Sequence, residues 1–121
     1  MALLRINNGN ASLLMVDTSQ IIHIEADGNY CVMYLADGTA EDLWISMKRF
    51  EELASEQVDG ATELIRVGKG TIVNRTYIYR ITPKKGELEL AGGEMDKHLV
   101  IHASEKALTT LKLFFEGGCE L

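Results

Sequence analysis

The feature that most constrains the fold is a succession of short apolar runs, each ended by residues that favour turns. Asp37-Gly38, for example, stands between two such runs and is a strong signal for a β-hairpin. The runs are rich in β-branched and aromatic residues, which favour strands. We therefore expect strands over residues 3–6, 12–16, 21–25, 30–36, 39–45, 64–67, 71–74, 77–82, 87–90 and 98–102.

Two segments interrupt this pattern, because their apolar residues recur at the spacing of a helix. Ser46 and Ser104 are each placed to cap a helix, since a serine oxygen accepts a hydrogen bond from a free backbone N–H of the first turn. The sequence thus predicts a mostly β fold with two short α-helices, at about 46–57 and 104–116.

A length of 121 residues suits one domain with a sizeable core and is too short for two, so we expect a single domain over residues 1–121. The first residues do not resemble a signal peptide, and no apolar run reaches membrane-spanning length. We therefore expect a cytoplasmic protein without membrane insertion. Cys31 lies in an apolar run and Cys119 in a glycine-rich tail, which favours a buried thiol and a stray thiol over a disulfide.

Positive charge is concentrated between Arg66 and Lys85, where six residues are basic and none is acidic. The formal net charge of the whole chain is −6, so the remainder carries −12 once these six charges are removed. An acidic protein repels nucleic acid on average, and a basic segment within it marks where a polyanion could bind. The six basic residues are Arg66, Lys69, Arg75, Arg80, Lys84 and Lys85.

Residues that could support catalysis or bind metal form no recognisable site. No serine or cysteine stands in a nucleophile motif, and the carboxylates are scattered, so we do not expect an enzyme. His98 and His102 are four residues apart in a predicted strand, which separates them by roughly 13 Å, too far for one ion to bind both. We predict no metal site and no cofactor.

Two sequence blocks carry a resemblance to a known family. Residues 25–30 read Glu-Ala-Asp-Gly-Asn-Tyr, and residues 66–78 contain Arg-Val, then Ile-Val-Asn, then Tyr-Ile. In this order, and with a helix around Phe50 between them, they resemble the LytTR family of bacterial DNA-binding domains. The resemblance covers the core of the chain, from about residue 3 to residue 115.

Members of that family have an elongated β fold with one or two short helices. They regulate transcription by placing loops from one face into successive major grooves of repeated sites. The resemblance places the contact positions in this chain after the first block, before the Ile-Val-Asn block and at the start of the last helix. The residues expected to contact DNA are Lys69 first, then Lys106, Asn29, Tyr30, Asn74, Arg75 and Ser104. Asn74 could instead serve a turn.

The chain departs from the family pattern at Gly68-Lys69-Gly70, where the family usually has His-Arg-Ser or His-Asn-Ser. Glycine has no side chain with which to contact a base, and one bidentate base contact supplies about 1 to 3 kcal/mol of discrimination. At 104–106 the chain has Ser-Glu-Lys, whereas the family commonly has serine followed by arginine. Two functions therefore stay open: a DNA-binding transcription regulator, or a module of the same fold that has exchanged DNA reading for protein interaction.

The resemblance also implies partners. Double-stranded DNA is the first, and the repeated sites of the family imply a homodimer on DNA. In the family the domain usually follows a receiver or sensor domain, and none fits before Leu3. We therefore expect regulation by a sensor or membrane regulator acting in trans.

Overall fold

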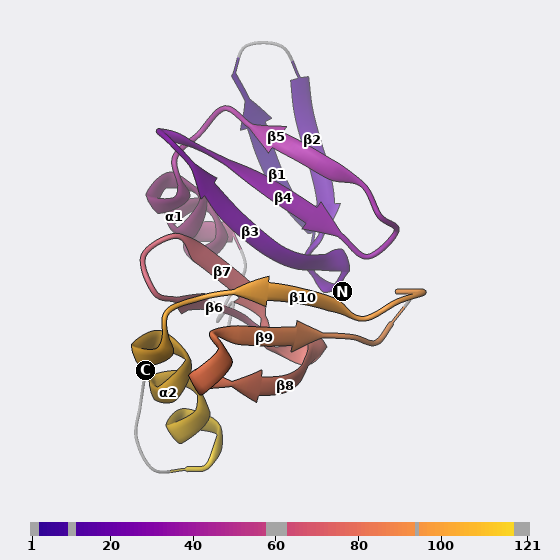
Figure 1. Ribbon diagram of the computed structural model, residues 1–121. Coiled ribbons are helices and arrows are strands. Elements are labelled where there is room, and N and C mark those ends of the chain that lie inside the picture. The colour runs from indigo at the N-terminus through magenta and orange to yellow at the C-terminus, as the bar shows by residue number, and fades with distance from the viewer. Residues whose placement is uncertain (1–2, 10–11, 58–62, 94, 118–121) are drawn as a thin grey trace.

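The computed structural model describes residues 3–9, 12–57, 63–93 and 95–117 of the chain. Its centre is a five-stranded antiparallel sheet with the strand order β5-β4-β3-β7-β6 (Figure 1). These strands are β3 (Ile21–Asp27), β4 (Tyr30–Leu35), β5 (Ala40–Leu43), β6 (Leu64–Val67) and β7 (Thr71–Asn74).

A first hydrophobic core joins this sheet to a hairpin and a helix. The hairpin consists of β1 (Leu3–Asn8) and β2 (Ser12–Asp17), and the helix is α1 (Met47–Gln57). Apolar side chains from all these elements meet in one cluster, because each element exposes an apolar face to the sheet. Its fully buried members include Leu4, Ile6, Ile24, Met33 and Phe50.

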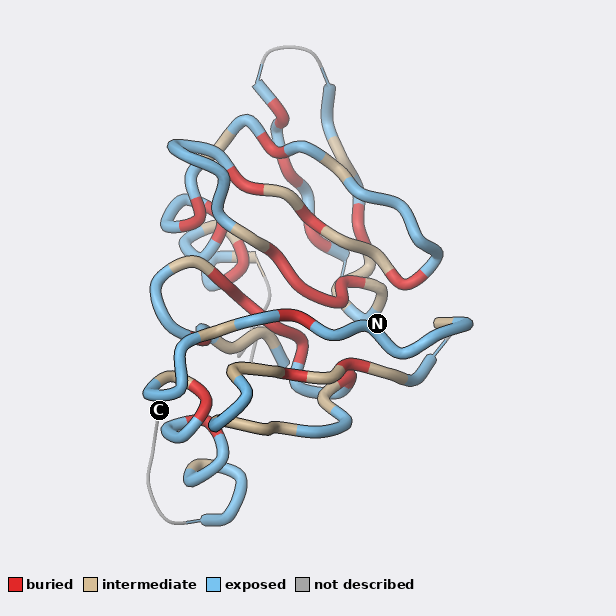
Figure 2. The backbone as a smooth tube through the Cα atoms, in the orientation of Figure 1, coloured by how far each residue is buried: buried red, intermediate tan, exposed pale blue. Residues whose placement is uncertain are grey.

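A second hydrophobic core joins the central sheet to a three-stranded sheet of order β10-β9-β8 and to helix α2. These elements are β8 (Ile78–Thr82), β9 (Glu87–Leu90), β10 (Leu99–His102) and α2 (Glu105–Phe115). Short 3-10 helices η1 (Thr18–Gln20), η2 (Arg75–Tyr77) and η3 (Pro83–Lys85) connect the strands. The molecule is thus mostly β with two helices, as predicted, and Figure 2 shows that burial concentrates in the central strands while the turns are exposed.

Strand β7 contributes to both cores because successive side chains in a strand point to opposite faces. Ile72 belongs to the first core and Val73 to the second. In the neighbouring strand β3 the register shifts between Ile21 and His23, and Ile22 belongs to the second core while Ile24 belongs to the first.

The helix caps predicted at Ser46 and Ser104 are confirmed. The oxygen of Ser46 accepts a hydrogen bond from the N–H of Arg49, and that of Ser104 accepts one from the N–H of Ala107, each at 3.1 Å. Strand predictions differ from the structure mainly at the ends. The strand expected from residue 77 begins one residue later, because Asn74 initiates the helical turn η2.

The buried thiol predicted at Cys31 is also confirmed. Its side chain is 1% exposed and donates to the carbonyl oxygen of Ile45 at 3.4 Å. Burial raises the pKa of this thiol to about 11, so it is not a reactive thiolate at neutral pH. Cys119 lies outside the described residues. Neither α1 nor α2, within the described part of the chain, is long and apolar enough to cross a membrane.

Candidate nucleic-acid interface

Three connections between elements lie on one side of the molecule, at the left in Figure 1: the β3–β4 turn, the β6–β7 turn and the start of α2. The N–H of Ala26, at the end of β3, donates to the carbonyl oxygen of Gly70 at 2.9 Å. A Cβ atom added at Gly68 would lie 3.5 Å from the Cβ of Ala107 in α2. The fold therefore brings together the three segments in which contact residues are predicted.

A groove of about 650 Å³ separates the β6–β7 turn from the N-terminus of α2. Three predicted contact residues, Lys69, Ser104 and Lys106, line this groove. The full lining consists of Arg66, Val67, Gly68, Lys69, Gly70, Thr71, His102, Ala103, Ser104, Lys106, Ala107 and Thr110.

The guanidinium of Arg66 builds the turn that holds Lys69. Its Nη2 donates to the carbonyl oxygen of Lys69 at 2.6 Å, and its Nε donates to that of Gly68 at 3.3 Å. Its Nη1 forms an ion pair with Glu51 of α1. Gly68 adopts a positive φ of 68°, which residues with a Cβ rarely adopt. Arg66 therefore has a structural role in the turn, and its positive charge is already paired.

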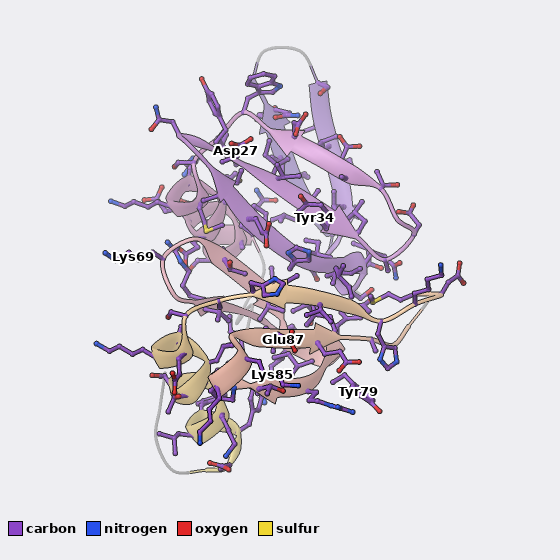
Figure 3. The ribbon with its side chains drawn as sticks, in the orientation of Figure 1. Asp27, Tyr34, Lys69, Tyr79, Lys85 and Glu87 are labelled. Atoms are coloured by element: carbon purple, nitrogen blue, oxygen red, sulfur yellow. The ribbon has the colours of Figure 1, made fainter. Side chains whose placement is uncertain are left out.

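Lys69 stands at the tip of this turn. Its side chain is exposed and has no hydrogen-bond or ion-pair partner among the residues that the structure describes. Figure 3 shows it projecting away from the body of the molecule. Lys106 is also exposed, on the first turn of α2, and its ammonium has no described protein partner either. The groove thus presents two lysine charges to solvent.

Ser104 caps α2 at the other wall of the groove. Its oxygen accepts from Ala107, which leaves its O–H free to donate to another acceptor. The N-terminus of a helix carries a partial positive charge and exposes backbone N–H groups, so it favours phosphate oxygens. Glu105 in the same turn opposes this effect with a negative charge.

Asn29 and Tyr30 occupy the β3–β4 turn and its exit, and both are exposed. They do not line the groove. The ring of Tyr30 packs edge to face with that of Trp44, with 5.3 Å between the centroids. Trp44 is 59% exposed and follows β5, and sequence reasoning did not single it out. An apolar residue at the end of a strand is ordinarily expected in the core.

Asn74 lies at the opposite end of β7 from the groove, and its burial argues against the predicted DNA contact. The side chain is 1% exposed. Its Nδ2 donates to the carbonyl oxygens of Ile21 at 2.9 Å and Thr18 at 3.4 Å, and its Oδ1 accepts from the N–H and the hydroxyl of Thr76. A buried amide with these partners has no group left for a base, which supports the alternative role in a turn.

The basic segment of the sequence is divided by the fold. The guanidinium of Arg75 lies over the rings of Phe114 and Phe115, 5.7 and 5.1 Å from their centroids, and does not line the groove. That of Arg80 lies 3.6 Å from the carboxylate of Glu89. Since Arg66 is also paired, the guanidinium groups of the segment contact the protein, and lysines supply its free charge.

His102 is a groove residue that the sequence did not reveal. It is exposed at the end of β10 and lines the groove beside Ser104. His98 lies outside the groove, and its Nδ1 is 2.5 Å from Glu89. A lone histidine in a strand usually has a packing or surface role, so the sequence offered no reason to select His102. Its place in the groove follows from the fold, which puts the end of β10 near the β6–β7 turn.

Comparison with known proteins adds independent information. The model of the LytTr DNA-binding domain family matches residues 11–116. Among solved structures, the fold is similar to the LytTr DNA-binding domain assigned to a methyl-accepting/DNA response regulator of Bacillus cereus. That similarity has a TM-score of 0.64 and 17% sequence identity, and it covers 95% of this chain and 97% of the other. A comparison with curated proteins gave no match.

Proposed function

The chain belongs to the LytTR family of DNA-binding domains, and we propose that it binds double-stranded DNA through the groove between the β6–β7 turn and α2, as a regulator of transcription. The observation that carries this proposal is the meeting of Lys69 and Lys106 on one groove, with neither ammonium paired to a described residue. Lysines without a protein partner are free to bind phosphate groups. Each such contact releases counterions from the DNA, and this release favours binding.

We propose that phosphate contacts dominate the affinity. Gly68 and Gly70 offer only backbone groups, and Arg66 donates to the turn and to Glu51. Lys69 is thus the side chain of this turn that can reach DNA, supported by Lys106 and the hydroxyl of Ser104. Asn29 and Tyr30 extend the proposed surface toward the β3–β4 turn. With two lysine–phosphate contacts, log affinity should fall with log salt concentration at a slope of about −2.

Sequence preference should be weak at the β6–β7 turn. To distinguish the four base pairs in the major groove, side chains must match the pattern of donors and acceptors on each base edge. A single lysine supplies donors alone, so it favours the acceptors of guanine or a phosphate oxygen without strong discrimination. Repeated sites bound by two copies of the chain would compensate, because two linked binding events multiply their affinities.

A partner in trans remains part of the proposal. We infer that a sensor or membrane regulator controls the domain, and that the domain itself acts in the cytoplasm, where DNA is accessible. The exposed Trp44 beside Tyr30 favours a protein contact as a second role, because exposed aromatic side chains are enriched in protein interfaces.

The test is fluorescence anisotropy with labelled DNA from the upstream region of the protein's own gene, over a series of salt concentrations. Lys69→Ala should weaken binding about eightfold at roughly 0.1 M salt and reduce the salt slope by about one. Lys84→Ala is the matched control, since Lys84 is an exposed lysine of η3 that does not line the groove. It should leave affinity nearly unchanged.

Two outcomes would contradict parts of the proposal. Equal binding by the wild type and Lys69→Ala would remove the groove as the contact site while leaving DNA binding intact. No binding by the wild type even at low salt would favour the module that has exchanged DNA for a protein partner.

A further inference from the structure

A second groove, of about 450 Å³, lies between the central sheet and strand β10. His23, Glu25 and Tyr34 line it from β3 and β4, and Leu99–His102 line it from β10. Tyr34 is labelled above β10 in Figure 3. None of the residues predicted to contact DNA lines this groove, although His102 lines both grooves. It is therefore a separate site that shares one strand with the interface.

His23 is the unusual residue of this groove. It is 3% exposed, and its Nδ1 is buried without a hydrogen-bond partner among the described residues. Its ring stacks on that of Tyr34, with centroids 4.4 Å apart and planes 8° apart, so the imidazole is held in one orientation. Buried polar atoms are nearly always hydrogen-bonded, and an exception in a groove indicates a missing partner.

The chemistry of His23 indicates what that partner must supply. Burial lowers the pKa of His23 to about 4, so the imidazole is neutral at neutral pH. A neutral imidazole with its proton on Nε2 leaves Nδ1 as a hydrogen-bond acceptor. We assign this tautomer to His23 as part of the proposal made below, and the missing partner is then a donor.

Glu25 adds a second acceptor at the mouth of the groove. Its Oε1 lies 3.8 Å from Nδ1 of His23, too far for a hydrogen bond between them. The Glu25 side chain is 40% exposed, and His23 is its one described interaction partner, so it can move aside to admit a ligand. An ionised carboxylate accepts hydrogen bonds and favours a positive charge.

Apolar side chains line part of both walls. Leu99 and Val100 of β10 are 36% and 44% exposed, and Tyr34 beside His23 is half-buried. We propose that this groove binds a small organic cation, whose N–H donors contact Nδ1 of His23 and the carboxylate of Glu25 while its apolar body packs against Tyr34 and Val100. An amidinium, with two N–H groups side by side, can contact both acceptors at once.

Two observations favour this occupant. Among the described residues, no group of three His, Cys, Asp or Glu side chains could hold a metal ion, so no metal site of that kind includes Nδ1 of His23. The other His–Glu pair in the structure is already satisfied, with Nδ1 of His98 2.5 Å from Glu89 and Arg80 3.6 Å from the same carboxylate. Of these two His–Glu pairs, the one that lines the groove, His23 and Glu25, is thus the one without a hydrogen bond between its side chains.

The experiment is a titration of the ¹⁵N-labelled protein with benzamidine, followed by ¹H–¹⁵N NMR without DNA. Amide signals of residues 23–25, 34 and 99–102 should shift and saturate with a dissociation constant of about 1 mM, a value typical of a fragment-sized ligand. Benzoate, which has a similar shape and the opposite charge, should leave these signals in place. Because no DNA is present, failure here is distinct from failure of the proposed DNA binding.

Variants identify the contacts. His23→Phe keeps an aromatic ring on Tyr34 but removes the acceptor, and Glu25→Gln removes the charge; each should weaken benzamidine binding about tenfold. Val100→Lys changes an exposed position, so the fold should persist while the added charge repels the ligand by a similar factor. Glu89→Gln is the matched control at the closed pair and should bind as the wild type does.

Saturating shifts confined to the groove, lost in these variants and retained in Glu89→Gln, would support the site. The proposal is overturned if benzamidine gives no saturable shift at these residues, or if benzoate shifts them equally. Wild-type affinity in both His23→Phe and Val100→Lys would also overturn it.

Discussion

The two ends of strand β7 differ in the exposure and partners of their polar residues, although both lie in the same short block of sequence. At its N-terminal end, the turn Gly68–Gly70 carries an exposed lysine over a groove. At its C-terminal end, Asn74 is 1% exposed, and both its amide nitrogen and its amide oxygen form hydrogen bonds within the protein. A motif can thus contain one part whose charge is free for a ligand and another that holds the fold, and polarity alone does not separate them.

The difference follows from what each polar group meets. Nδ2 of Asn74 reaches the carbonyl oxygen of Ile21, which lies 53 residues earlier in the chain, and so links β7 to the entry of β3. The side chain of Lys69 has no such partner among the described residues. The carbonyl oxygens of Gly68 and Lys69 accept hydrogen bonds from the guanidinium of Arg66. Changes at the Asn74 end should therefore reduce stability, while changes at the Lys69 end should reduce DNA binding.

The largest effect is expected at the buried end. Asn74→Ala removes the partner of Ile21 and both acceptor contacts to Thr76, and should lower the free energy of unfolding by about 2 to 4 kcal/mol. Urea unfolding followed by circular dichroism measures this change. Asn29→Ala, at an exposed turn, is the control and should change stability by less than about 0.5 kcal/mol. If Asn74→Ala lowered the free energy of unfolding by no more than the control does, the proposed structural role of Asn74 would be wrong.

A comparable effect is expected at the middle of β7, where Val73 pairs with His23 of β3. Burial lowers the pKa of His23 from 6.5 to about 4, so below pH 6.5 the unfolded chain binds a proton that the folded chain does not. Stability should therefore fall as pH decreases from about 6.5 to 4, by up to about 3 kcal/mol from this group, and the loss should stop below the folded pKa.

Urea unfolding of the wild type and His23→Phe at several pH values measures this contribution, since the difference between the two proteins isolates the imidazole. The variant should show a flatter dependence over this range. His98→Phe, at an exposed histidine, should follow the wild type. Parallel curves for the wild type and His23→Phe would show that protonation of His23 does not destabilise the folded protein.

An intermediate effect is expected at Gly68. Alanine there must adopt a positive φ, which costs about 1 to 2 kcal/mol, while its Cβ meets Ala107 at an ordinary contact distance of 3.5 Å. Gly68→Ala should lower the free energy of unfolding by about 1 kcal/mol and also weaken DNA binding, because the turn carries Lys69. Gly38→Ala is the control, since it has positive φ but lies outside the groove. It should lose stability without losing affinity.

The smallest stability effect is expected at the exposed end. Lys69→Ala and Lys106→Ala should each change the free energy of unfolding by less than about 0.5 kcal/mol. Their effects on DNA binding should be additive, because the two proposed phosphate contacts are independent, and the double variant should lose most of the salt dependence. A stability loss at Lys69 comparable to that at Asn74 would remove the contrast between the two ends of β7.

Local features of this fold were predictable from sequence because they depend on neighbours in the chain. Asp37-Gly38 forms the expected turn, with Gly38 at a positive φ, and Ser104 caps the expected helix. Turn and capping chemistry involve residues a few positions apart. The three segments expected to carry contacts also proved to be adjacent in the fold.

The roles of individual polar residues were not predictable, because they depend on distant partners. Arg66 was expected to add charge for a polyanion, and its pairing with Glu51 requires α1 to pack beside β6. The groove at His23 and Glu25 likewise forms only where β10 lies against the central sheet. Such contacts join segments that are remote in sequence, so no local pattern indicates them.

Gly68 and Gly70 also set a spacing. Added Cβ atoms would lie 3.5 Å from Ala107 and 3.8 Å from Ala26, so the bare turn fits closely between the last helix and the β3–β4 hairpin. Larger side chains at these two positions would separate the three contact segments. The glycines therefore fix how far apart Lys69, Ser104 and the β3–β4 turn stand, and the chain has a compact surface at a turn whose glycines have no side chain that could contact a base.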